Sequence, residues 1–162
     1  MRKIGIYSGS FDPVHRGHIA FATEAAKLCS LDAVVFLPER MPRDKPDVSP
    51  ISERVTELEI ALRELPFSVI ELPMDRFTVA DTLPELTTRY PDSFFVFLIG
   101  SDVALKLAQW PNIQQLAAHY EFAVGMRIHE SETEVQNALK QLNVRYTLVV
   151  TSFPDVSSSS LK

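Results

Sequence analysis

Apolar, β-branched runs alternate along this chain with segments that have the hydrophobic spacing of amphipathic helices, and this alternation restricts the fold more than any other feature. The apolar runs cover residues 3–8, 33–38, 67–72, 94–100, 121–126 and 145–151. The helical segments cover residues 18–28, 52–65, 79–90, 113–119 and 132–142. Strands that are apolar almost throughout must be covered on both faces. The order of elements therefore predicts an α/β fold with a doubly wound, mainly parallel sheet in three layers.

Length and composition fit one globular domain that spans residues 1–162. The net charge of -5 argues against a nucleic-acid-binding protein, which would need a basic face. No apolar run approaches the roughly 20 residues of a membrane span, and the N-terminus has no signal-peptide core. The single cysteine, Cys29, excludes an internal disulfide and a multi-cysteine metal cluster. We therefore expect a cytoplasmic protein whose partners include neither a nucleic acid nor a membrane.

The stretch GSFDPVHRGH, residues 9–18, follows the first apolar run and leads into the first helical segment. In doubly wound sheets, ligands bind beyond the carboxyl ends of the strands, which is where this stretch is expected. Gly9 and Ser10 allow a sharp turn and a close approach to a ligand. His15 and His18 are three residues apart, so they face one side of a helix near its free N–H groups. The pattern predicts a phosphate site. A zinc site is less well supported, because no HExxH carboxylate accompanies the histidines.

Two further segments follow other strands and are expected at the same edge of the sheet. The loop LPERMPRDKP, residues 37–46, contains Lys45, which could offset the charge of a phosphate, although an ordinary solvated loop has a similar composition. In LIGSDVALKLAQWPN, residues 98–112, Asp102 could accept hydrogen bonds from a ribose or cap a helix. Trp110 could stack on a flat ring or belong to the core.

The C-terminal stretch DVSSSSLK, residues 155–162, combines a serine run with a final lysine. A serine-rich terminus is typical of a disordered tail. After an apolar strand, the hydroxyl and N–H groups of this run could instead bind phosphate, together with the lysine.

The pattern Gly9-Ser10-Phe11-Asp12-Pro13-Val14-His15-x-Gly17-His18 resembles the signature of the HxGH nucleotidyltransferases, which transfer a nucleotidyl group from a nucleoside triphosphate to a phosphate-bearing acceptor. The Gly-x-Asp-(seven residues)-Trp spacing of residues 100–110 is similar to that of the bacterial nicotinate-mononucleotide adenylyltransferases. The resemblance extends over residues 3–162 and implies a Rossmann-like nucleotidyltransferase fold. It also implies that AMP passes from ATP to nicotinate mononucleotide with release of pyrophosphate, and that Mg²⁺ accompanies ATP.

The resemblance implies roles for the residues that match the family's motifs. Those expected to act on the reacting phosphates are His15, His18, Ser10 and Lys45. The expected nucleotide-binding residues are Gly9, Phe11, Gly17, Gly100, Asp102, Ser157, Ser158, Ser159 and Lys162. The expected acceptor-binding residues are Thr78, Trp110 and Arg127. No residue of the chain is expected to ligate a metal directly.

The chain departs from the family's pattern in its second loop and at its C-terminal end. Asp44 stands where the family has a histidine, Lys162 stands where it has an arginine, and the family's C-terminal helix is expected to be missing or truncated. Two alternatives stay open: a pantetheine-phosphate adenylyltransferase, which shares the first motif, and a non-catalytic protein that binds adenine nucleotides. The segment from Gly100 to Trp110 favours a pyridine acceptor over pantetheine. A homo-oligomer is compatible with each alternative.

Overall fold

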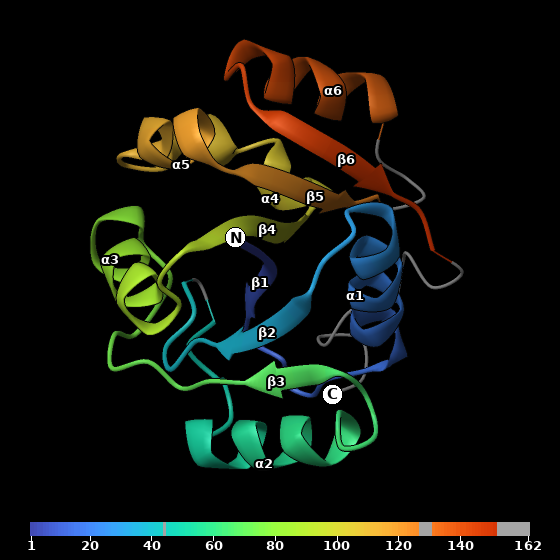
Figure 1. Cartoon of the computed structure of the whole chain (residues 1–162). Helices are drawn as coiled ribbons and strands as arrows, with labels where there is room; N and C mark the ends of the chain where they lie inside the picture. Colours follow the sequence, from blue (N-terminus) through green and yellow to red (C-terminus); the bar gives the residue numbers. More distant parts are fainter. Residues whose placement is uncertain (44, 127–130, 152–162) are drawn as a thin grey trace.

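The computed structural model describes residues 1–43, 45–126 and 131–151, and these form a six-stranded sheet flanked by helices (Figure 1). The strands are β1 (Arg2–Gly9), β2 (Ala33–Pro38), β3 (Phe67–Val69), β4 (Ser93–Gly100), β5 (Glu121–Gly125) and β6 (Arg145–Val149). They lie in the order β3-β2-β1-β4-β5-β6, and every neighbouring pair is parallel. The predicted doubly wound, parallel sheet is therefore confirmed.

Helices cover both faces of this sheet. They are α1 (Arg16–Leu28), α2 (Ile51–Ala61), α3 (Val79–Arg89), α4 (Ser101–Ala104), α5 (Ile113–His119) and α6 (Glu132–Gln141), with a 3₁₀ turn, η1, at Leu107–Gln109. Apolar residues of α1 and α2 form one buried cluster with Phe36 and Leu98 of the sheet. Apolar residues of α3, α5 and α6 form a second buried cluster with Ile6 and Phe97. The two clusters create the three layers that apolar strands require.

The helix boundaries follow from capping residues and prolines. α1 begins after His15 and α3 begins after Thr78, and the side chain of each accepts a hydrogen bond from a backbone N–H of the first turn. α2 ends at Ala61, earlier than predicted, and the chain turns before Pro66, because a proline disfavours helical backbone at the residue that precedes it. The sequence does not predict α4 and η1, since segments this short show no clear helical period.

β3 is shorter than predicted, because it covers Phe67–Val69 rather than residues 67–72. It lies at the edge of the sheet and pairs only with residues 34–36 of β2. A strand with one neighbour loses its ladder of hydrogen bonds where that pairing ends. The chain then leaves the sheet and passes towards α3 (Figure 1).

The register of the sheet brings the strand ends that carry the motifs to one edge. Gly9 of β1 pairs with Pro38 of β2, and Gly100 of β4 pairs with Gly125 of β5. The segments that follow these strands therefore start side by side, at the edge where doubly wound folds bind ligands. Within the described ranges, no helix is long and apolar enough to cross a membrane.

Candidate functional site

A cavity of about 420 Å³ opens at the carboxyl edge of the sheet, at the ends of β1 and β4. Small-molecule sites typically enclose roughly 300–1,000 Å³. The lining comes from the turn after β1, the loop after β2, the segment before α3 and the segment after β4. It includes the following residues predicted for the site: Gly9, Ser10, Lys45, Gly100, Asp102 and Trp110. The structure thus joins the predicted phosphate turn, cationic loop and tryptophan segment in one cavity.

His15 and His18 lie at the start of α1, directly after the turn that lines the cavity, and are not lining residues themselves. The Nδ1 atom of His15 accepts from the N–H of Gly17 at 3.0 Å, and the Nδ1 atom of His18 accepts from the N–H of His15 at 3.1 Å. Each neutral ring therefore carries its proton on Nε2. The Nε2 atom of His15 is buried and has no hydrogen-bond partner in the part of the chain that the structure describes. The Nε2 N–H groups are thus left free of the hydrogen bonds that hold the Nδ1 atoms.

Both histidines are predominantly neutral near pH 7. The pKa of His18 falls to about 3, first because burial disfavours the charged ring and second because of the charges of His15 and Lys45. Burial also lowers the pKa of His15. An anion at this position would meet neutral donors from the histidines and a full positive charge from Lys45.

Lys45 connects the loop after β2 to the turn after β1. Its Nζ atom donates to the Oγ of Ser10 at 3.0 Å, although the two residues are 35 positions apart. A second contact supports this junction, because Oδ2 of Asp12 accepts from the N–H of Ser49 at 2.8 Å. The predicted phosphate turn and the predicted cationic loop therefore form one structural unit.

The other predicted residues of the first motif hold the histidines in position. The ring of Phe11 is 1% exposed and lies edge-on to the ring of His18, with centroids 5.0 Å apart. A Cβ on Gly9 would lie 3.3 Å from the Phe11 ring, so a larger residue there would crowd it. Gly17 is buried, and its N–H is already bound by His15. A direct contact of Phe11 or Gly17 with a nucleotide stays a prediction.

The segment after β4 gives the cavity a carboxylate and an aromatic wall. Asp102 lies in the first turn of α4, and a Cβ on Gly100 would lie 2.6 Å from its Oδ1 atom. Trp110 is half-buried, and its ring centroid lies 5.8 Å from that of Phe77. Phe77 lies edge-on to Phe97 of β4 at 5.7 Å. Trp110 therefore packs against the core and also lines the cavity, and its stacking on a flat ring stays a prediction.

Thr78, which is predicted to bind the acceptor, caps α3 and does not line the cavity. Its Oγ1 accepts from the N–H of Asp81 at 3.2 Å, and its N–H donates to Oγ1 of Thr82 at 3.0 Å. The two preceding residues, Arg76 and Phe77, line the cavity instead. The role of Thr78 in acceptor binding stays a prediction.

Several residues with predicted roles lie outside the described residues. They are Arg127, Ser157, Ser158, Ser159 and Lys162, together with Asp44, the residue that differs from the family's histidine. Their roles stay predictions.

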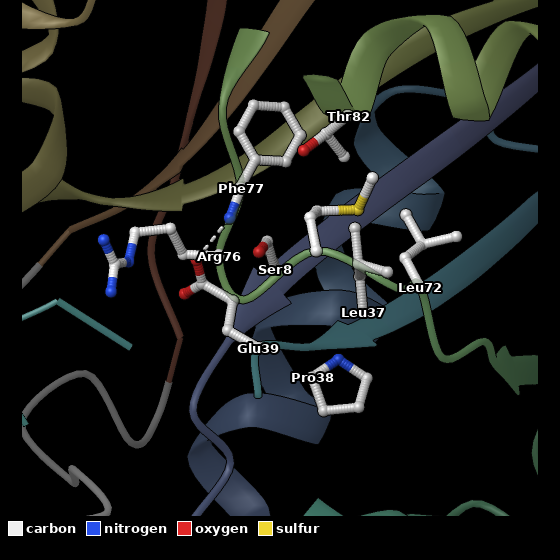
Figure 2. A pocket seen from close by; sticks show the side chains of 9 residues that line it. Ser8, Leu37, Pro38, Glu39, Leu72, Arg76, Phe77 and Thr82 are labelled. Carbon is white, nitrogen blue, oxygen red and sulfur yellow. Dashed lines mark hydrogen bonds between the residues drawn. The ribbon is translucent and has the colours of Figure 1, made fainter. Parts of the chain in front are cut away.

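Glu39 is a cavity residue that the sequence motifs do not reveal (Figure 2). Its Oε2 atom accepts from the N–H of Phe77 at 2.6 Å. Burial raises the pKa of Glu39, while this hydrogen bond and nearby cations act against the rise. A second pocket of about 10 Å³, with room for about one water molecule, lies beside it and is lined in part by Ser8 and Thr82. A single glutamate in a loop gives no sequence signal of such burial.

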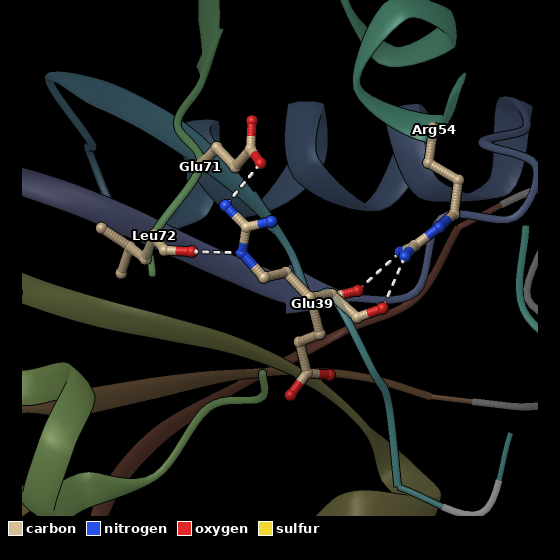
Figure 3. A network of polar contacts seen from close by, with 5 residues as sticks. Glu39, Arg54, Glu71 and Leu72 are labelled. Carbon is tan, nitrogen blue, oxygen red and sulfur yellow. Dashed lines mark hydrogen bonds and ion pairs between the residues drawn. The ribbon is translucent and has the colours of Figure 1, made fainter. Parts of the chain in front are cut away.

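Arg54 is a second residue that the motifs do not reveal, and it fixes the geometry of the site (Figure 3). It is 1% exposed. At 2.6–2.9 Å its guanidinium donates to the backbone carbonyls of Ser10, Glu39, Arg40 and Ser49. Figure 3 shows two of these four hydrogen bonds, those to Glu39 and Arg40. These bonds tie the turn after β1 to the loop after β2, the two segments that carry Ser10 and Lys45.

The sequence does contain a signal for Arg54. Ile51 lies three positions before it and Leu58 four positions after it, so an arginine occupies the core-facing side of α2. A buried arginine must find hydrogen-bond acceptors, and here backbone carbonyls supply them. The outer end of the same loop is held by Arg40, which pairs with Glu71 at 2.7 Å (Figure 3).

Known proteins similar to this chain agree in family and fold. The cytidylyltransferase-like family matches residues 6–162. Relatives from Bacillus mycoides and Bacillus licheniformis, each named "Probable nicotinate-nucleotide adenylyltransferase", are 36% and 35% identical, and each alignment covers 100% of this chain and 85% of the relative. A solved structure with a similar fold is that of the Plasmodium falciparum nicotinic acid mononucleotide adenylyltransferase complexed with NaAD. Its TM-score is 0.79 at 19% sequence identity, and the match covers 99% of this chain and 82% of that chain. The chain therefore belongs to the cytidylyltransferase-like family of nucleotidyltransferases, together with these two relatives named as probable nicotinate-nucleotide adenylyltransferases.

Proposed function

We propose that the protein transfers the AMP portion of ATP to nicotinate mononucleotide, which yields pyrophosphate and nicotinate adenine dinucleotide, a precursor of NAD. One observation carries this proposal: Ser10 and Lys45 share a single cavity with Asp102 and Trp110. Such a site combines a cationic, hydrogen-bonding end for phosphates with an aromatic surface for a flat ring. The names of the full-length bacterial relatives support the same reaction.

In this reaction a phosphate oxygen of the acceptor attacks the α-phosphorus of ATP, and the bond between that phosphorus and the pyrophosphate oxygen breaks. The attacking oxygen is already nucleophilic, so the protein needs neither a covalent nucleophile nor a strong general base. Catalysis then consists of aligning the two substrates and stabilising the charge on the phosphoryl oxygens.

The first motif and Lys45 perform this charge stabilisation. His15 and His18 donate from Nε2 to phosphoryl oxygens, with His18 at the α-phosphate, because their Nδ1 atoms are occupied by backbone N–H groups. Ser10 adds its hydroxyl. The ammonium group of Lys45, which now rests on Ser10, contacts the reacting phosphates of both substrates.

The remaining predicted residues bind the rest of the substrates. Trp110 stacks on the pyridine ring, and Asp102 accepts from ribose hydroxyl groups. Thr78 and Arg127 contact the acceptor. The serine run, Ser157–Ser159, and Lys162 bind the triphosphate through hydroxyl groups, N–H groups and one positive charge.

Mg²⁺ would enter the site with ATP, bound by phosphate oxygens and water, and would neutralise part of the phosphate charge. Among residues 1–43, 45–126 and 131–151, no group of three or more histidine, cysteine, aspartate or glutamate side chains could hold a metal ion alone. The use of ATP also fits the cytoplasmic location expected from the sequence.

The proposal can be tested with the full chain, ATP, Mg²⁺ and one acceptor at a time. With nicotinate mononucleotide we expect release of pyrophosphate and formation of the dinucleotide. With phosphopantetheine we expect neither product, because that acceptor has no flat ring for Trp110. If phosphopantetheine is turned over and nicotinate mononucleotide is not, the protein is a pantetheine-phosphate adenylyltransferase and the proposal fails. Binding of ATP without pyrophosphate release from either acceptor would replace it by the non-catalytic alternative.

A further inference from the structure

Arg76 lies between β3 and α3 and lines the same cavity as Trp110. It is half-buried. Its Nε atom donates to the backbone carbonyl of Met41 at 3.2 Å, which holds the guanidinium beside the loop after β2. Figure 2 shows this guanidinium extending away from the small pocket around Ser8 and Thr82. The terminal amino groups of Arg76 have no hydrogen-bond partner among the described residues.

Glu39 is an acidic residue of the same cavity, and the charge of Arg76 acts on its carboxylate. Its carboxylate receives the N–H of Phe77 at 2.6 Å, and no ion pair within 4.0 Å joins Glu39 to Arg76 in the described ranges. Burial raises the pKa of Glu39, and the charge of Arg76 is one of the effects that act against this rise, so the two groups interact at a longer range than an ion pair. The planar fork of Arg76 is therefore available to an anionic group of a ligand.

The aromatic wall formed by Phe77 and Trp110 lines the same cavity as this fork. Phe77, the next residue along the chain, lies 5.8 Å from Trp110, and both side chains line the cavity with Arg76. A flat ring bound against this pair would present one edge to the guanidinium. A carboxylate on that edge can accept two parallel N–H bonds from an arginine, whereas a carboxamide can accept only through its one oxygen and carries no charge.

We propose, on the basis of the proposed function, that Arg76 selects acceptors whose pyridine ring bears a carboxylate over those whose ring bears a carboxamide. Hydrogen bonds to charged groups are worth enough to give a preference of about 10- to 100-fold. Arg76 is then a specificity-determining residue that touches the substituent of the acceptor's pyridine ring.

The test compares two acceptors that share the ribose and phosphate and differ only in this substituent: nicotinate mononucleotide and nicotinamide mononucleotide. For each, kcat/KM and the dissociation constant from calorimetry are measured with the wild-type chain, Arg76→Gln and Lys106→Gln. Lys106 is a matched control, because it is another cation that lines the cavity. Thermal melts check that both variants fold.

We expect Arg76→Gln to reduce the ratio of kcat/KM for nicotinate mononucleotide to kcat/KM for nicotinamide mononucleotide at least about 10-fold. Most of this change should come from weaker binding of nicotinate mononucleotide. Lys106→Gln should leave the ratio unchanged. An equal loss of kcat/KM for both acceptors in Arg76→Gln would overturn the inference, since Arg76 would then bind the phosphate or ribose that the two acceptors share. An Arg76→Gln variant with unchanged kcat/KM for both acceptors would also overturn it. These outcomes leave the proposed function intact. The proposed function fails separately if the wild-type chain forms no dinucleotide from either acceptor, and the calorimetric ratio then still decides the role of Arg76 in binding.

Discussion

The imidazole rings of His15 and His18 are stacked, with centroids 3.7 Å apart and 22° between their planes. Each ring is fixed by a backbone N–H that its Nδ1 atom accepts, and the Phe11 ring supports His18 from the side. The pair is thus held in one orientation before any substrate binds. Such preorganised donors lower the barrier because they need not reorient during the reaction.

His18→Ala should lower kcat by about 10²- to 10³-fold, the usual effect of losing one preorganised donor to the transition state. Steady-state pyrophosphate release measures this. His119→Ala is a matched control, because His119 is exposed and precedes β5, at the opposite edge of the sheet. Equal turnover in wild-type protein and His18→Ala would remove His18 from the mechanism.

The stability of the fold should fall as the pH drops from about 6.5 towards 3. An unfolded histidine binds a proton near pH 6.5. The pKa of native His18 is about 3, so between these values the unfolded state binds more protons and gains stability relative to the folded state. Burial lowers the pKa of His15 as well, which acts in the same direction.

Denaturant unfolding at pH 7.5, 6.5 and 5.5 measures this dependence. His18→Asn removes one of the two groups, so its free energy of unfolding should decline less steeply with falling pH than that of the wild type. Identical slopes for the two proteins would show that the native and unfolded states bind the His18 proton equally well.

Arg54→Met should lower the free energy of unfolding by about 3 kcal/mol, because four backbone carbonyls, in one buried and three partly buried hydrogen bonds, lose their donor. Chemical denaturation provides the measurement. Arg63→Met is the control, since Arg63 is exposed just beyond α2, and its change should stay within about 0.5 kcal/mol. A similar, small effect for both substitutions would show that the loop after β2 does not depend on Arg54.

Trp110→Ala should raise the KM for nicotinate mononucleotide by about 2- to 12-fold, the range that an aromatic contact of 0.5–1.5 kcal/mol provides. The KM for ATP should not change, because ATP has no contact with this ring in the proposed site. Trp110→Phe keeps an aromatic surface, so it should raise the KM for nicotinate mononucleotide less than Trp110→Ala does. If the KM for ATP rises instead, Trp110 stacks on adenine and the two substrates exchange places.

The fold was predictable because its signal is local and repeated. Apolar runs that must be buried on both faces, separated by helical periods, fit a doubly wound sheet, and the order β3-β2-β1-β4-β5-β6 is one of its forms. The errors lie at the ends of elements. β3 stops at Val69 because its pairing ends opposite Phe36, although β2 itself continues to Pro38, and this divergence is set by tertiary contacts. α4 is too short to show a helical period.

The sequence by itself determined the chemistry that gathers at the carboxyl edge, because strand order and motif position bring Ser10, Lys45 and Trp110 to one side of a parallel sheet. Only the tertiary structure decided that His18 is neutral, that Arg54 ties together the two segments that carry Ser10 and Lys45, and that Arg76 lines the same cavity as the aromatic wall. Contacts between residues more than ten positions apart produce these properties, and such contacts leave no local pattern in the chain, although the helical spacing of α2 does indicate that Arg54 faces the core.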